Sequence, residues 1–144
     1  MNSLSSPSPL TRALGTAGLI PFIAGAASRW LFRDSAAAAH IGFALTAYSA
    51  TIAAFLGGVH WGPTLRSGGE ASLSLGWGVL PQLAGWLAPF MPTCAGLLTC
   101  AAVLAACYAA DRLLYPGEGS AAWLPMRLQL TVVATASCIV GAAS

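Results

Sequence analysis

The eight residues FLGGVHWG, Phe55–Gly62, close a long apolar stretch and decide what kind of fold the chain has. The stretch runs from about Ala36 to Trp61, and an α-helix of about 20 apolar residues crosses the roughly 30 Å hydrocarbon core of a bilayer. Two adjacent glycines near its end indicate a close contact between helices, because each glycine costs a helix about 1 kcal/mol relative to alanine. The sequence therefore predicts a transmembrane helix that packs tightly beside a histidine and a tryptophan.

The composition is that of a membrane protein rather than a soluble globule. The chain has 144 residues, of which 57% are hydrophobic and 7% charged, with a mean hydropathy of +0.75, whereas a soluble domain has about 25% charged residues. Too few charged side chains are present to cover a water-exposed surface. The net charge of +2 is scattered along the chain, and it does not form the clustered basic face that nucleic-acid binding requires.

Hydropathy predicts an all-α bundle of five transmembrane helices in one domain, residues 10–144, behind a disordered tail, residues 1–9. The spans are expected at about residues 10–32, 36–61, 73–90, 94–114 and 122–142. Pro21 should kink the first span, because proline removes a backbone hydrogen bond inside a helix. The segment DRLLYPGEGS, residues 111–120, has the composition of a loop.

Arginine positions predict the orientation of the chain in the membrane, because cytoplasmic loops and helix ends carry an excess of Lys and Arg. In the five-span arrangement, the N-terminal face holds Arg12, Arg66, Arg112 and Arg127, and the opposite face holds Arg29 and Arg33. The N-terminus is therefore expected in the cytoplasm and the C-terminus outside.

Small residues predict which helices touch, because helices in lipid associate through close packing rather than through burial of apolar surface. Along the second span, small residues recur at every fourth position, at Thr46, Ala50, Ala54, Gly58 and Gly62, with Ser49, Ala53 and Gly57 beside them. The second span is thus expected at the centre of the bundle. The expected packing positions are Ala50, Ala54, Gly57, Gly58, Pro21 and Pro81. Gly58 should tolerate a leucine far less well than Val59 does.

Three interpretations of His60 and Trp61 are open. Trp61 can anchor the helix at the interface while His60 caps its end. His60 can instead ligate a haem, but His40 lies roughly 30 Å away along the same helix, so a cysteine, a methionine or a partner chain would have to complete that site. In the third interpretation, this membrane face binds an anionic headgroup or another subunit. The residues expected there are Arg12, His60, Trp61, Trp77, Asp111, Arg112, Trp123 and Arg127, and Arg127 is expected to extend toward the membrane surface.

The sequence gives little sign of catalysis. No Asp or Glu lies near the middle of a span, where ion and proton carriers generally need ionisable groups. Glycine-rich phosphate loops, His-Glu metal motifs and serine nucleophile motifs are missing. His60 with Asp111 is the one plausible acid–base pair. We therefore predict no catalytic residue, no metal site and no cofactor, apart from the possible haem at His60.

Four segments resemble a known family. They are LGTAGLIPFIAG (14–25), AYSATIAAFLGGVHWG (47–62), GWGVLPQLAGWLAPF (76–90) and WLPMRLQLTVVATAS (123–137). Together they resemble the small bacterial and mitochondrial membrane proteins of the transmembrane-protein-sixty-nine type, domain of unknown function 3429. The resemblance implies five spans and no particular activity. The matching positions are Gly57, Gly58, His60, Trp61, Pro81, Trp86 and Arg127.

These observations lead to an expected function. We expect a non-catalytic accessory or assembly subunit of a larger energy-converting membrane complex, respiratory or photosynthetic, in the bacterial inner membrane. Its partners would be membrane lipids and other integral membrane subunits, and not nucleic acid. The alternative is an independent lipid- or tetrapyrrole-binding membrane protein that uses the His60/Trp61 face.

Overall fold

The computed structural model describes residues 6–68 and 72–144, and every regular element in those two stretches is a helix. The elements are α1 (Pro9–Ala17), α2 (Ile20–Leu31), α3 (Ala38–Val59), α4 (Trp61–Ser67), α5 (Ser72–Leu87), the 3₁₀ turn η1 (Ala88–Phe90), α6 (Thr93–Glu118), the 3₁₀ turn η2 (Ala121–Trp123) and α7 (Leu124–Ala142). Most of the predicted tail, residues 1–5, lies outside the described residues. Ser8 caps α1 by accepting a hydrogen bond from the Thr11 N–H at 3.2 Å.

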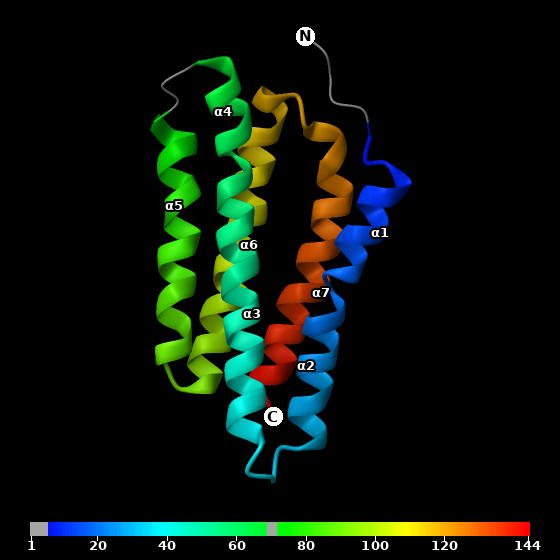
Figure 1. Ribbon diagram of the computed structural model, residues 1–144, viewed down its shortest axis with the longest axis vertical. Coiled ribbons are helices and arrows are strands. Elements are labelled where there is room, and N and C mark those ends of the chain that lie inside the picture. The colour runs from blue at the N-terminus through cyan, green and yellow to red at the C-terminus, as the bar shows by residue number, and fades with distance from the viewer. Residues whose placement is uncertain (1–5, 69–71) are drawn as a thin grey trace.

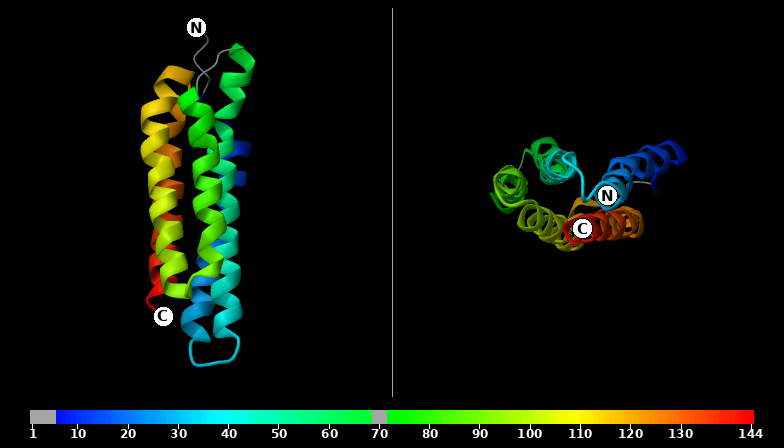
Figure 2. Two further views of the ribbon diagram at one scale, coloured as in Figure 1. Left: turned by 90° about the vertical axis from the view of Figure 1, so that its left-hand side faces the viewer. Right: turned by 90° about the horizontal axis from the view of Figure 1, so that it is seen from below.

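The helices form an antiparallel bundle in which the chain passes repeatedly between two ends (Figures 1 and 2). In the described part of the chain, four segments are long and apolar enough to cross a membrane: Pro9–Leu31, Ala38–Arg66, Thr93–Glu118 and Ala121–Ala142. Helix α5 has 16 residues, which form about 24 Å of helix. It is shorter than the roughly 20 residues that a crossing helix needs. The predicted all-α bundle is confirmed, and four of its five predicted spans are supported by length and hydropathy.

The first predicted span is two helices with a break between them. Helix α1 ends at Ala17 and α2 begins at Ile20, so that Pro21 occupies the first turn of α2, where a missing N–H does no harm. Pro21 is exposed, so it interrupts the span as predicted but does not serve as a packing position. Helix α2 stays in the bundle, and α1 leads away from it (Figure 2, right).

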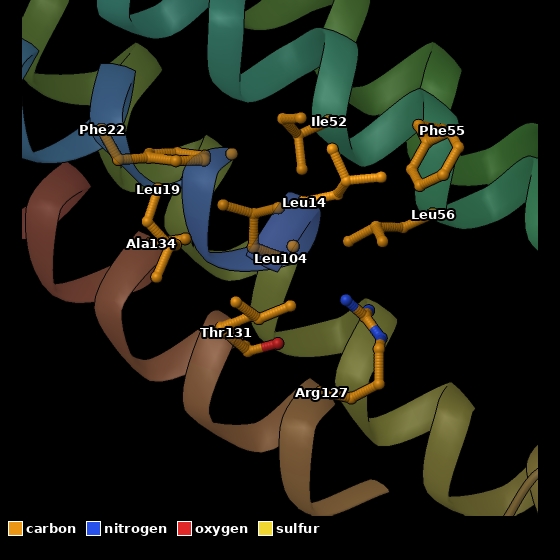
Figure 3. A pocket seen from close by; sticks show the side chains of 13 residues that line it. Leu14, Leu19, Phe22, Ile52, Phe55, Leu56, Leu104, Arg127, Thr131 and Ala134 are labelled. Atoms are coloured by element: carbon orange, nitrogen blue, oxygen red, sulfur yellow. The ribbon is translucent and has the colours of Figure 1, made fainter. Parts of the chain in front are cut away.

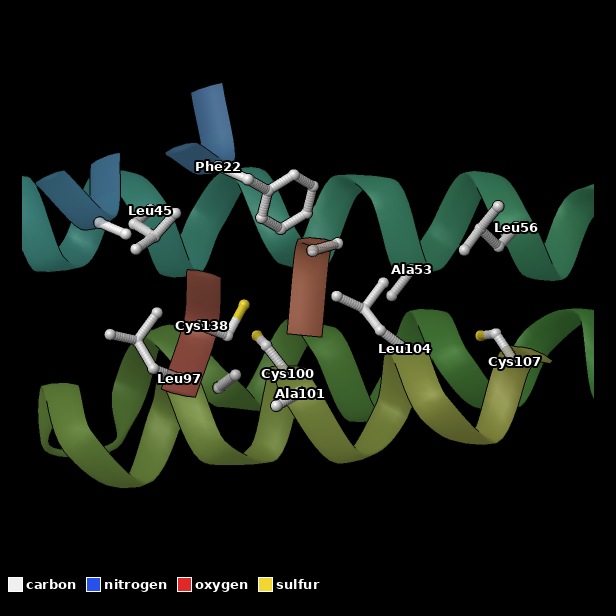
Figure 4. Close-up of a cluster of buried hydrophobic side chains, with 13 residues drawn as sticks. Phe22, Leu45, Ala53, Leu56, Leu97, Cys100, Ala101, Leu104, Cys107 and Cys138 are labelled. Atoms are coloured by element: carbon white, nitrogen blue, oxygen red, sulfur yellow. The ribbon is translucent and has the colours of Figure 1, made fainter. Parts of the chain in front are cut away.

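Helix α3 lies at the centre of the bundle, as predicted, and shares that place with α6. It packs against α2, α5 and α6 and also touches α7. Side chains from these helices form a core in which Ala53, Leu97, Cys100 and Leu104 are at most 1% exposed (Figure 4). The small side chains in this core let the helix backbones approach closely.

The glycine doublet is divided between the inside and the outside of the bundle. A Cβ added at Gly57 would lie 2.5 Å from the carbonyl oxygen of Gly78 on α5, whereas one added at Gly58 would meet no atom within 4 Å. Successive residues of a helix point about 100° apart, so both glycines cannot face the same neighbour. Close contacts were predicted at both glycines; the one at Gly57 is present, and the one at Gly58 is not made within this chain.

The interface between α3 and α5 uses small residues from both helices. Pro81 is buried, and its Cδ would lie 3.4 Å from a Cβ at Gly57. Further along, a Cβ at Gly85 would lie 3.2 Å from the Cα of Ala50. Ala54, between these two contacts on α3, is half-buried. Ala50, Gly57 and Pro81 are thus found where the sequence predicted close packing.

Helix α6 continues past the predicted end at residue 114 and includes most of the segment interpreted as a loop. It passes through Pro116 and ends at Glu118, where Gly119 adopts the left-handed conformation with φ 74°. The Ser120 N–H then donates to the Tyr115 carbonyl at 2.8 Å. This left-handed glycine cap satisfies the last carbonyl groups of the helix, so the loop begins at Gly119 and not at Asp111.

The end of the bundle away from α4 is closed by Arg29 on α2. Its Nη1 donates to the Ala38 carbonyl at 2.9 Å, and its Nη2 donates to the Ser144 carbonyl at 3.2 Å. These bonds join the start of α3 to the residues that follow α7.

We predict opposite effects for alanine at the two adjacent glycines. Gly57→Ala places a methyl group against the α5 backbone and should lower the free energy of unfolding by about 1–3 kcal/mol. Gly58→Ala adds a methyl group in open space and should raise it, by up to about 1 kcal/mol, because alanine favours the helix. Circular dichroism during thermal unfolding in detergent micelles measures both. Equal effects of the two substitutions would contradict the assigned interface.

Candidate functional site

Four ionisable side chains from three helical segments meet near one end of the bundle. His60 stands between two carboxylates: its Nε2 lies 3.0 Å from Asp111 Oδ1, and its Nδ1 lies 3.1 Å from Glu118 Oε1. The second oxygen of Asp111 receives Arg127, whose Nε donates to Oδ2 at 2.7 Å and whose Nη2 lies 2.6 Å from the same atom. We call His60, Asp111, Glu118 and Arg127 the ion cluster.

Local structure places each member of the ion cluster. His60 is the junction residue between α3 and α4. Asp111 and Glu118 are seven residues apart on α6 and therefore lie on one face of that helix. Arg127 lies in the first turn of α7. Tyr115, also on the Asp111 face of α6, covers the imidazole, and the two ring centres are 5.5 Å apart.

The ion cluster is deeply buried. His60 and Asp111 are 0% and 1% exposed, Arg127 is 9% exposed, and the Glu118 side chain is 12% exposed. Charges removed from water to this degree are tolerated only when they are paired and hydrogen-bonded. The expectation that Arg127 extends to the membrane surface is therefore wrong, because its guanidinium is held inside by Asp111.

Counting protons gives the charge of the ion cluster. Each of the two His60 nitrogens faces a carboxylate oxygen, and a proton must lie between each such pair for the contact to be a hydrogen bond. Two protons shared by His60, Asp111 and Glu118 leave this trio with one negative charge, which Arg127 neutralises. The described geometry is therefore that of a neutral cluster, and neutrality is what a low-dielectric interior favours.

The same contacts leave no position for a haem iron or another metal at His60. An axial ligand needs a free ring nitrogen with its lone pair directed at the metal, and both nitrogens of His60 are occupied by carboxylates. Among residues 6–68 and 72–144, no group of three or more His, Cys, Asp and Glu side chains is arranged to hold a metal ion. The arrangement is suited to joining α3, α6 and α7 through charge.

The other residues predicted for this membrane face do not join the ion cluster. Arg12 and Arg112 are exposed. Trp61 is 40% exposed, and its Nε1 donates to the Leu75 carbonyl at 3.1 Å, which ties α4 to α5. Trp77 and Trp123 are half-buried, and the Nε1 of each is buried without a hydrogen-bond partner among the described residues.

Sequence reasoning paired His60 with Asp111 as the plausible acid–base pair, and the structure places the two in contact. It missed Glu118 and Tyr115, because Pro116 and the glycines around Glu118 suggested a loop. The available signal was the spacing of Asp111, Tyr115 and Glu118, which are four and three residues apart and therefore fall on one helical face.

The fold and the ion cluster together define the class of the protein: an all-α bundle with four helical segments apolar enough to make it a multi-pass membrane protein. The chain belongs to the family described as "Protein of unknown function (DUF3429)", which matches residues 7–143. This match confirms the resemblance to domain of unknown function 3429. No curated protein and no solved structure matches the chain.

We predict that removing one charge from the ion cluster destabilises the protein more than removing two. Asp111→Asn leaves the Arg127 guanidinium buried without a counter-charge and should cost about 3–5 kcal/mol of unfolding free energy. The double variant Asp111→Asn, Arg127→Gln removes both charges and should recover part of that loss. Unfolding in detergent micelles, followed by circular dichroism, measures both.

The matched control is Arg112→Gln, because Arg112 adjoins Asp111 in sequence but is exposed. This substitution should change the unfolding free energy by no more than about 0.5 kcal/mol. A double variant less stable than Asp111→Asn would show that the pair is not coupled as described.

Proposed function

We propose that this protein is a non-catalytic accessory or assembly subunit of a larger energy-converting membrane complex, and that it acts by packing its helices against those of its partners. The proposed location is the bacterial inner membrane. The proposal combines a structural role for the ion cluster with an outer surface that is suited to helix contacts.

The ion cluster supports a structural rather than a catalytic role. Its charged groups are turned toward one another, and His60, the one plausible general base, is fully buried with both ring nitrogens engaged. A general acid or base must come within hydrogen-bond reach of a substrate proton, and this geometry gives His60 no such access. The cluster fits a junction that holds α3, α6 and α7 together.

The observation that carries the proposal is the outward position of Gly58 and Gly62. A Cβ at either glycine would meet no atom of this chain within 4 Å, so packing within the bundle does not explain glycine at these positions. Gly58 and Gly62 are four residues apart and are flanked by exposed Phe55 and Leu65. A surface of this kind allows a transmembrane helix of another subunit to approach closely.

We further infer that α5 is the fifth crossing. With the turn η1 added, the segment 72–90 reaches about 30 Å, the thickness of the hydrocarbon core. Five crossings agree with the positions of α1 and of the end of α7, which lie near opposite ends of the bundle (Figure 1). The arginine distribution supports an arrangement with the N-terminal face in the cytoplasm and the C-terminus outside.

The tetrapyrrole alternative has no support in the geometry of His60. Haem ligation would require the imidazole to leave both Asp111 and Glu118, and it would then uncover two buried carboxylates. The lipid-binding alternative uses the same face, where Trp61 is 40% exposed and His60 is fully buried.

The proposal is tested by following the chain through gentle detergent extraction and native gel electrophoresis. The wild-type protein should migrate with larger partners. Gly58→Leu should reduce the fraction in the large band by about tenfold, equivalent to ~1.4 kcal/mol of association free energy, because leucine obstructs the outward contact. The purified variant should unfold at a temperature no lower than that of the wild type, because leucine favours the helix more than glycine does.

Val59→Leu is the matched control, since Val59 is adjacent and already bulky, and it should leave the large band intact. Migration of the wild-type chain alone would overturn the proposal. If the isolated chain also carried a stoichiometric chromophore with a Soret band, the tetrapyrrole alternative would be correct instead.

A further inference from the structure

An apolar groove lies between the first two helices and the helices α3 and α7 (Figure 3). Its volume is about 190 Å³. The lining is aliphatic or aromatic over most of its length and includes Leu14, Phe22, Ile52, Leu56, Leu104 and Leu130. Along α7 it extends from Arg127 to Ala134, about 10 Å of helix.

The groove is a consequence of the break between α1 and α2. Helix α2 packs against both α3 and α7, whereas α1 packs chiefly against α7. The α1–α7 contact is made at Gly15, where an added Cβ would meet Met126 and Leu130. The space between α1 and α3 is left open, and its two rims carry Leu14 and Phe55, which are 65% and 67% exposed. The groove therefore opens to the side, where the acyl chains of the bilayer lie.

One end of the groove carries a fixed cation. Arg127 is the charged residue in the lining, and its guanidinium projects from α7 toward Leu56 (Figure 3). Its Nε donates to Asp111 Oδ2 at 2.7 Å and its Nη2 lies 2.6 Å from the same oxygen, so the carboxylate fixes the direction of the guanidinium.

Among the described residues, this end of the molecule also has an excess of positive charge. Arg12 lies one helical turn before Gly15 on α1, and it is exposed without a carboxylate partner in the described part of the chain. Arg66 and Arg112 are unpaired there as well, while Asp111 and Glu118 are engaged within the ion cluster. Anionic lipid headgroups are attracted to such a surface.

We propose that the groove binds one acyl chain of an anionic glycerophospholipid. The chain enters from the side between α1 and α3 and lies against Leu56, Leu104 and Ala134. The headgroup oxygens accept hydrogen bonds from Arg127 and from Arg12 at the membrane face. Neither His60 nor Trp61 lines this groove.

Native mass spectrometry of the full chain in detergent, mixed with equal amounts of phosphatidylglycerol and phosphatidylcholine, tests this proposal. The wild-type protein should retain one lipid and prefer phosphatidylglycerol. Leu14→Trp should reduce retention of both lipids to background, because the larger ring fills the mouth of the groove. Leu10→Trp is the matched control, since Leu10 is on the same helix and 68% exposed but does not line the groove.

A second pair of variants tests the headgroup. Arg12→Gln should weaken retention of phosphatidylglycerol about fivefold, from the roughly 1 kcal/mol that one arginine contributes near an anionic headgroup. Arg66→Gln removes the same charge from the same end of the bundle but lies on α4, away from α1 (Figure 1). Arg66→Gln should have little effect on the retention of phosphatidylglycerol.

If the Leu14→Trp variant retained lipid at the wild-type level, the proposed position of the acyl chain in the groove would be wrong. Equal effects of Arg12→Gln and Arg66→Gln, or equal retention of the two lipids by the wild type, would overturn the assignment of an anionic headgroup at Arg127 and Arg12.

Discussion

The structure depends on one requirement, that a carboxylate buried among membrane helices must be neutralised by groups that reach it. Asp111 is 1% exposed, and its two oxygens are shared between His60 and Arg127. These partners come from α3 and α7, so the charge of one side chain on α6 fixes three helical segments at one end. In lipid, apolar burial provides little attraction between helices, and a charge contact of this kind therefore determines their arrangement as well as their proximity.

Below the ion cluster, the bundle relies on small side chains and not on large complementary ones. Gly57 and Gly78 bring α3 and α5 to backbone contact, and Ala53 and Cys100 fill the space between α3 and α6. At the opposite end, Arg29 donates to backbone carbonyl groups and not to a carboxylate. The two ends thus use the same residue type in different ways: Arg127 balances a buried charge, and Arg29 satisfies backbone groups that the helix ends leave free.

Hydropathy could predict the bundle and most of its spans, because a bilayer imposes the length and composition of any helix that crosses it. The sequence predicted close contacts at both Gly57 and Gly58, since two adjacent small residues give the same pattern whichever of them faces the neighbour. The end of α6 was missed for another reason: Pro116 and the glycines around Glu118 have the composition of a loop. Pro116 is tolerated near the helix end, and the left-handed cap falls at Gly119, five residues past the predicted end at residue 114. Contacts between distant residues, such as His60 with Glu118, are not encoded in any local spacing.

Arg127 belongs both to the ion cluster and to the lining of the groove. These two surroundings explain why the residue at this position is an arginine. A free arginine near a helix end would extend along the helix to the membrane surface, and it would then lie outside the groove. The carboxylate of Asp111 holds Nε and Nη2 and so prevents that extension. The remaining donors of the planar guanidinium are then fixed in direction, so little conformational freedom is left to lose when a ligand oxygen arrives. A lysine could balance the same charge, but its single ammonium group could not hold Asp111 and present oriented donors to the groove at the same time.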